Sequence, residues 1–149
     1  LSLHDALPIS LSCSTREAGC EAATALGIAV GEPVIYVERL LRFNGETVVF
    51  DQIHLVSDLF AGLTLESLSG GDRSLYSLFE NDYGVRMIHA EEHLRAVAAD
   101  AYSAGLLAVQ PGAPLLLVER TAYTYGNKPV EWRRGLYCTN RHYYRNDLG

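Results

Sequence analysis

The chain has 149 residues, of which 48% are hydrophobic and 20% are charged, a composition typical of one globular domain with a buried core. Its formal net charge of −6 argues against a large phosphate-binding face, because nonspecific affinity for nucleic acids depends mainly on lysine and arginine. Cys13, Cys20 and Cys138 are an odd number without C-x-x-C spacing, which predicts neither a disulfide framework nor a zinc site and favours the reducing cytoplasm. No apolar run approaches the roughly 20 residues needed to span a bilayer, so we expect a soluble domain.

The first ten residues show no clean periodicity and contain Pro8. We interpret Leu1–Ser10 as a linker or a cloning scar and assign the functional domain to residues 11–149. Ser14 and Glu17 have the spacing of a capping box, in which each side chain binds a free amide at the start of a helix. This pattern predicts a helix over Thr15–Leu26, closed by Gly27.

A β-hairpin is predicted around Asn44-Gly45, the strongest short-range hairpin signal in a sequence. β-Branched and aromatic residues on both sides predict strands over Val34–Phe43 and Glu46–Leu55. With a two-residue turn, Arg39 lies opposite Phe50. With a three-residue turn ending in a bulge at Gly45, Arg39 and Asp51 share one face and form a polar pocket wall.

The segment from Gly70 to Tyr76 is expected to open another helix, because Leu75, Leu78 and Phe79 recur at helical spacing. Asp72 or Ser74 would cap this helix. Alternatively, the free amides at its start would bind an anion.

The remaining pattern indicates a strand over Val85–Val97, a short helix over Ala98–Leu107, and a hairpin formed by Leu115–Tyr123 and Val130–Thr139. Most of the connections are too short for parallel crossovers. The sequence therefore predicts an α+β fold, an antiparallel sheet with helices packed on it.

His89, Glu91 and His93 alternate on one face of a predicted strand, which is the geometry of a metal triad. Such alternation is more typical of the solvated face of a half-buried sheet. We therefore expect no metal, no cofactor and no catalytic residue, and the sequence contains no G-x-S-x-G, HExxH or P-loop motif.

The strand Val130–Thr139 carries the polar residues of most interest. If it is regular, Glu131, Arg133, Gly135 and Tyr137 lie on one face. Glu131 and Tyr137 beside a small glycine would form a pocket for a small molecule. The alternative is an edge strand whose charged residues face solvent.

A series of short motifs in a fixed order resembles the UTRA domain, the effector-binding module of the HutC branch of GntR-type bacterial transcription regulators. The resemblance covers residues 11–148. Its motifs are Leu26-Gly27, Gly31-Glu32-Pro33-Val34, Glu38-Arg39-Leu40, Asn44-Gly45-Glu46, Ser74-Leu75-Tyr76, Tyr83-Gly84, Ala113-Pro114-Leu115-Leu116, Glu119-Arg120, Gly126-Asn127-Lys128-Pro129-Val130-Glu131 and Tyr137-Cys138-Thr139-Asn140-Arg141-His142-Tyr143.

The resemblance implies a chorismate-lyase-like fold with a ligand pocket between sheet and helices. It also implies a homodimer in the cytoplasm that controls DNA through a separate N-terminal winged helix-turn-helix, for which this chain has no room. A small-molecule metabolite would be its effector, and no membrane would be involved. The pocket positions of the family fall on Arg39, Asp51, Ser74, Glu131 and Tyr137, with Arg133 and Arg141 at the rim.

Two departures from the family pattern bear on the ligand. Phosphosugar-sensing members carry a second arginine where this chain has Leu41, and the usual C-terminal motif has lost a basic and an acidic residue between Tyr137 and His142. A carboxylate or a less charged metabolite is therefore favoured over a phosphosugar. The alternatives to an effector sensor are a chorismate-lyase-like enzyme and a dimerisation module without a ligand.

Overall fold

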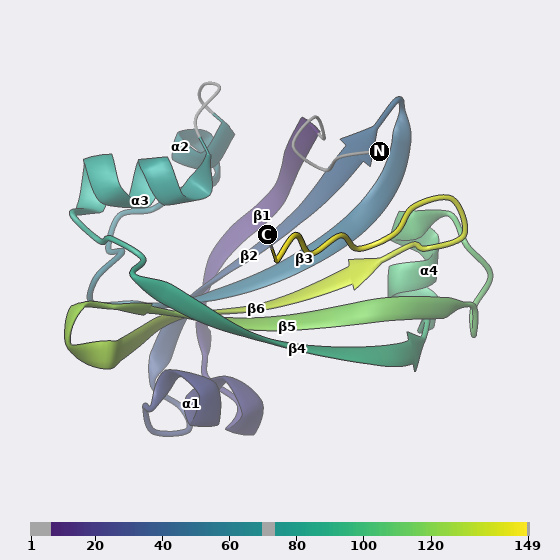
Figure 1. The fold of residues 1–149 in the computed structure, drawn as a ribbon. Helices are drawn as coiled ribbons and strands as arrows, with labels where there is room; N and C mark the ends of the chain where they lie inside the picture. Colours follow the sequence, from purple (N-terminus) through teal and green to yellow (C-terminus); the bar gives the residue numbers. More distant parts are fainter. Residues whose placement is uncertain (1–6, 70–73, 149) are drawn as a thin grey trace.

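The computed structural model describes residues 7–69 and 74–148. Six strands form one antiparallel sheet in the order β1-β2-β3-β6-β5-β4, with helices on both faces (Figure 1). This arrangement confirms the predicted α+β class. Within the described ranges, no helix is both long and apolar enough to cross a membrane.

The N-terminal region differs from the prediction. Strand β1 (Leu7–Glu17) pairs with β2, and Thr15 lies opposite Ile35. The four residues from Leu7 to Ser10 thus belong to the sheet rather than to a linker, while residues 1–6 lie outside the described ranges. The predicted capping box is wrong, because ladder pairing with β2 overrides a local motif of four residues. Helix α1 (Cys20–Leu26) begins only after Gly19 and ends at Gly27, which has a left-handed backbone as expected of a glycine cap.

The first hairpin is confirmed as strands β2 (Pro33–Phe43) and β3 (Glu46–Val56). Phe43 pairs with Glu46, so the turn has two residues, and Asn44 and Gly45 both have positive φ. The register shifts between Leu41 and Arg42, which leaves Val48 as an extra residue. Because of this bulge, Arg39 lies opposite Asp51, although neither turn considered from the sequence placed the bulge there.

Two helices follow β3: α2 (Leu65–Ser69), which the sequence did not predict, and α3 (Leu75–Tyr83). Ser74 caps α3, since its side chain accepts a hydrogen bond from the amide of Ser77, and Gly84 closes the helix. Gly70 to Arg73, which include the alternative cap Asp72, lie outside the described residues.

The second half of the sheet consists of β4 (His89–Ala98), β5 (Pro114–Thr124) and β6 (Lys128–Tyr137), with α4 (Ala101–Leu107) between β4 and β5 and a short 3-10 turn, η2 (Tyr125–Asn127), between β5 and β6. Strand β4 starts four residues later than predicted. Strand β6 lies between β3 and β5, so the interpretation of an edge strand facing solvent is wrong.

Helices cover the two sheet faces differently, and we name the faces after them. On the α3 face, α2 and α3 lie on the opposite side of the sheet from α1 (Figure 1), and the ring of Phe79 packs 4.7 Å from that of Phe60. On the α1 face, Ala22, Ala23 and Leu26 join Trp132 in a buried apolar cluster. A separate cluster packs α4 against Phe50, Leu115, Leu117 and Leu136, which lie on the α1 face by strand alternation.

Candidate functional site

The α3 face contains a largely buried group of charged and phenolic side chains, which we call the polar cluster. Strand pairing explains its position: Arg39 lies opposite Asp51, Asp51 opposite Gly135, and Arg120 opposite Arg133. The alternation predicted for β6 is confirmed, since Glu131 and Arg133 face this side while Trp132 faces the other. The members of the cluster are Arg39, Asp51, Tyr76, Arg120, Glu131 and Arg133.

Both carboxylates of the polar cluster are paired. Asp51 accepts a hydrogen bond from Arg39 Nε at 3.0 Å and has Arg133 Nη1 at 3.8 Å from its Oδ2. Glu131 accepts from Arg133 Nη2 at 2.9 Å. Asp51 is 2% exposed and Glu131 is fully buried, so both ionic partners are needed to offset the loss of hydration.

Tyr76 connects helix α3 to the sheet. Its hydroxyl donates to Glu131 Oε1 at 3.0 Å and accepts from Arg120 Nη1 at 3.0 Å. The guanidinium carbons of Arg120 and Arg133 each lie 5.7 Å from the centre of the Tyr76 ring, within cation–π range. Burial, and then the charge of Glu131, raise the pKa of Tyr76 to about 12, so the phenol keeps its proton.

The two arginines beside Asp51 have different electrostatic surroundings. Burial, followed by the charge of Arg133, lowers the pKa of Arg39. Burial also lowers the pKa of Arg133, but Glu131, Asp51 and Tyr76 together outweigh it and hold that pKa above its ordinary value. Arg133 therefore lies inside the cluster, with a side chain only 14% exposed, and not at the rim where it was expected.

Tyr137 occupies the far end of the same face. A Cβ atom on Gly135 would lie 2.8 Å from Cε1 of Tyr137 and 3.0 Å from Oδ1 of Asp51. A glycine at this position thus leaves the space that both side chains use. Burial, and then the charge of Asp51, raise the pKa of Tyr137 to about 12.

The other two expected residues lie outside the charged group. Ser74 forms the cap of α3, two residues before Tyr76. Arg141 has a 74% exposed side chain and binds Glu46 Oε1 at 2.8 Å, near the turn of the first hairpin. The structure therefore brings Arg39, Asp51 and Glu131 together and leaves Arg141 apart.

Sequence reasoning missed Tyr76 and Arg120 as members of the site. Tyr76 follows the cap by two residues, and only the packing of α3 on the sheet brings it to Glu131. Arg120 lies in a predicted strand, but its partner across the ladder, Arg133, depends on the register of β5 and β6. Arg120 extends the cluster outward, since its Nε lies 3.3 Å from Glu92 Oε2, and Glu92 also accepts from the Tyr144 hydroxyl.

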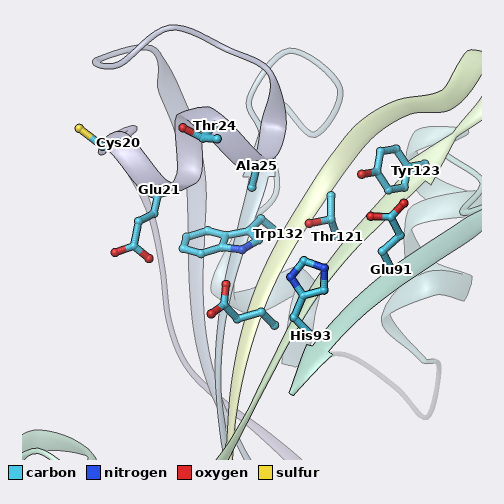
Figure 2. A pocket seen from close by; sticks show the side chains of 10 residues that line it. Cys20, Glu21, Thr24, Ala25, Glu91, His93, Thr121, Tyr123 and Trp132 are labelled. Atoms are coloured by element: carbon cyan, nitrogen blue, oxygen red, sulfur yellow. The ribbon is translucent and has the colours of Figure 1, made fainter. Parts of the chain in front are cut away.

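His89, Glu91 and His93 do not form a metal centre with one another. Across residues 7–69 and 74–148, no group of three or more His, Cys, Asp or Glu side chains is arranged to hold a metal ion. His89 stacks on Tyr123 with ring centres 4.6 Å apart, whereas Glu91 and His93 line a cavity on the α1 face (Figure 2).

Comparison with known proteins agrees with this architecture. A sequence model of the UTRA domain matches residues 9–143, nearly the whole chain. The chain belongs to the UTRA domain family. The family assignment predicted from the ordered motifs is therefore confirmed.

Solved structures give the same result. The ligand-binding domain of a GntR-family transcriptional regulator from Bordetella bronchiseptica superposes with a TM-score of 0.91 and 46% identity, covering 97% of this chain and 89% of that one. The effector domain of PhnF from Mycobacterium smegmatis superposes with a TM-score of 0.83 and 26% identity, covering 97% and 88%. The UTRA chain thus has the fold of ligand-binding and effector domains of this regulator family.

Curated relatives are transcription regulators by name. The transcriptional repressor PhnF of Mycolicibacterium smegmatis is 29% identical over 119 residues, which are 80% of this chain and 48% of that protein. The repressor NagR of Bacillus subtilis is 25% identical over 122 residues, 82% of this chain and 49% of that protein. The chain spans about half the length of the curated relatives it matches.

Proposed function

We propose that this UTRA domain senses a small metabolite, which binds at the polar cluster on the α3 face. The observation that carries the proposal is the cluster itself, in which three guanidiniums and two carboxylates lie together under a helix. Burying an ion pair rarely increases stability relative to apolar residues of the same volume. Five charged groups in one place, four of them with side chains no more than 14% exposed, are therefore better explained by recognition of a polar ligand than by stability.

The charge of the cluster favours a ligand with an anionic end. Three guanidiniums outnumber the two carboxylates, and Glu92 offsets the excess only at the outer end. Nε of Arg133 is buried and has no hydrogen-bond partner within the described residues, which leaves one donor open. Since an unsatisfied buried donor is costly, an oxygen of the ligand at this position would be stabilising.

Each expected residue has a role in this proposal. Arg39 and the start of α3 at Ser74 hold the anionic end through a charge-assisted bond and helix amides. Asp51 and Glu131 accept hydrogen bonds from hydroxyl or amine groups of the ligand, and Tyr137 covers an apolar part. Leu41, which replaces the second arginine of phosphosugar sensors, favours a carboxylate over a phosphate.

Binding would be coupled to a movement of α3. The Tyr76 hydroxyl is hydrogen-bonded to both Glu131 and Arg120. A ligand that binds either of these side chains must therefore displace Tyr76, and with it the first turn of α3. A ligand shifts such an equilibrium only by its difference in affinity for the two arrangements. The hydrogen bonds of Tyr76 supply that difference in affinity. They are present in the closed arrangement, in which Tyr76 contacts Glu131 and Arg120, and are replaced by ligand contacts in the open arrangement, in which Tyr76 is displaced.

In the longer protein, we infer, this domain belongs to the HutC branch, forms a homodimer in the cytoplasm and controls a winged helix-turn-helix domain that binds DNA. The domain binds without chemistry and needs no cofactor. The polar cluster contains no activated nucleophile, and the phenols of Tyr76 in the cluster and Tyr137 beside it have raised pKa values, so the site is poorly suited to acid–base catalysis at neutral pH. Incubation with chorismate is expected to release no pyruvate.

A thermal-shift screen of sugar acids, amino acids, aromatic and imidazole carboxylates and phosphosugars tests the proposal. A ligand at one hundred times its dissociation constant should stabilise the domain by about 2.7 kcal/mol. Arg39→Gln should abolish the shift. Arg42→Gln is the matched control, because Arg42 lies on the same strand but is exposed and donates to the carbonyl of Gly45. A shift that survives in Arg39→Gln would place the ligand elsewhere.

A further inference from the structure

A cavity lies on the opposite side of the sheet from the polar cluster. It has a volume of about 490 Å³, within the range of small-molecule sites, and opens between α1 and strands β4, β5 and β6 (Figure 2). We call it the α1 cavity. It is lined by Cys20, Glu21, Thr24, Ala25, Glu91, His93, Glu119, Thr121, Tyr123 and Trp132.

Trp132 forms the floor of the α1 cavity. The side chain lies between Ala25 of α1 and the residues of β4 and β5 (Figure 2), and the residue is only 6% exposed. The ring of His54 packs against it with centres 4.7 Å apart. Its indole Nε1 donates to no acceptor within the described residues, and Figure 2 shows this nitrogen on the edge of the ring nearer Thr121 and His93. The indole N–H is thus open to the cavity and makes no hydrogen bond within the described residues.

Three carboxylates surround this aromatic floor: Glu21 from α1, Glu91 from β4 and Glu119 from β5. Within residues 7–69 and 74–148, none of the three forms an ion pair or a side-chain hydrogen bond. Arg134 is opposite Glu119 in the ladder but lies beyond ion-pair distance and does not line the cavity. The cavity therefore has three carboxylates that form no ion pair within the described residues, while His93 also lines it and Arg134 lies across the ladder from Glu119.

These features select one class of ligand. A cation gains from the three carboxylates and from the face of an indole, which attracts positive charge. An apolar body would fill the space between Trp132, Ala25 and Tyr123. The indole N–H, which can only donate, would pair with an oxygen acceptor on the same molecule.

We propose that the α1 cavity binds a small organic amine that carries an apolar body and a hydroxyl or carbonyl oxygen. The charge of this site is opposite to that of the polar cluster: carboxylates are in excess here, and guanidiniums are in excess there. It uses the alternate residue of the same strand, since Trp132 lies between Glu131 and Arg133. The domain thus has two sites of opposite charge preference on the two faces of β6.

Intrinsic fluorescence gives a direct test, because Trp132 is the only tryptophan of the chain. The probe is 2-amino-1-phenylethanol, and its matched controls are 1-phenyl-1,2-ethanediol, which replaces the amine by a hydroxyl, and the anion mandelate. We expect a saturable change in fluorescence with the amine at concentrations up to about 10 mM, at least about tenfold weaker binding of the diol, and no binding of mandelate.

Variants locate the binding. The double variant Glu91→Gln with Glu119→Gln should weaken binding of the amine at least about tenfold, since it removes two of the three charges and conserves shape. Glu66→Gln makes the same change on α2, away from the cavity, and should bind like the native chain. Circular dichroism shows whether the double variant folds. If it does not, Glu119→Gln alone replaces it, and a smaller loss of affinity for the amine is expected.

Three results would overturn the proposal: no saturable response to the amine, equal affinity for the diol, or undiminished binding by the variant that lacks the cavity carboxylates. The last result would place the amine at another site.

Discussion

The two faces of strand β6 differ in how their carboxylates are paired. On the α3 face, Asp51 and Glu131 are buried and bound by arginines, and Tyr76 closes the group from above. On the α1 face, Glu91 and Glu119 line an open cavity without a partner within the described residues. The difference teaches that the polar cluster must open to admit a ligand, whereas the α1 cavity is already open.

The largest expected effect comes from removing one charge of the polar cluster. Glu131→Gln should lower the free energy of unfolding by about 3–5 kcal/mol, the usual cost of breaking a buried ion pair, because Arg133 then loses its nearest anion. Urea unfolding measures the change. The matched variant Glu91→Gln on the α1 face should change the same quantity by no more than about 0.5 kcal/mol. Equal effects would erase the contrast between the two faces.

The next effect is a pH dependence that arises on the α1 face. Burial lowers the pKa of His54 from 6.5 to about 4, so the unfolded chain binds a proton there before the folded chain does. Stability is therefore lost as pH falls from about 6.5 to about 4, by on the order of 3 kcal/mol in all. Urea midpoints measured across this window should fall steeply for the native chain.

His54→Phe should flatten that slope, because the group that takes up the proton on unfolding is absent. His89→Gln, which replaces an exposed histidine stacked on Tyr123, should keep the native slope. If His54→Phe retains the full slope, the neutral state of His54 is not what limits stability in acid.

A steric prediction concerns the floor of the polar cluster. Gly135→Ala should cost about 1–3 kcal/mol by overpacking, since the new methyl group would push against Tyr137 and Asp51. Thermal unfolding measures the loss, and binding of any hit from the screen should weaken as well. Gly105→Ala in α4 meets no atom within 4 Å and should stabilise the helix by up to about 1 kcal/mol. If Gly135→Ala leaves the stability unchanged, the side chain of Tyr137 can move away from the new methyl group without cost.

The smallest effect separates the two roles of Ser74. Ser74→Ala should cost about 1 kcal/mol of stability through loss of the helix cap. Ser74→Asp conserves the cap but adds negative charge, so it should retain stability and still weaken an anionic effector. Isothermal titration with the ligand from the screen, together with urea unfolding, distinguishes these results. Unchanged affinity in Ser74→Asp would remove the start of α3 from the site.

The site could be predicted only in part. Arg39, Asp51 and Glu131 could be predicted from the sequence, because hairpin signals and the alternation of β6 limit which residues can share a face. Even there, the pairing of Arg39 with Asp51 depends on a bulge at Val48 that carries no special residue. Tyr76 and Arg120 could not be assigned, since their roles arise from the docking of α3 and from the register of β5 on β6.

The sequence by itself determined the local elements: both long hairpins, the glycine cap of α1, a cap of α3 at Asp72 or Ser74, and the alternation along β6. These depend on interactions between residues close in the chain, where turn geometry and propensity decide. Only the tertiary structure decided that residues 14–17 join a strand, that β6 is central, and that Glu131 and Trp132 face two different sites. Those outcomes depend on pairing between distant segments, which buries the charges of one face and leaves a cavity on the other.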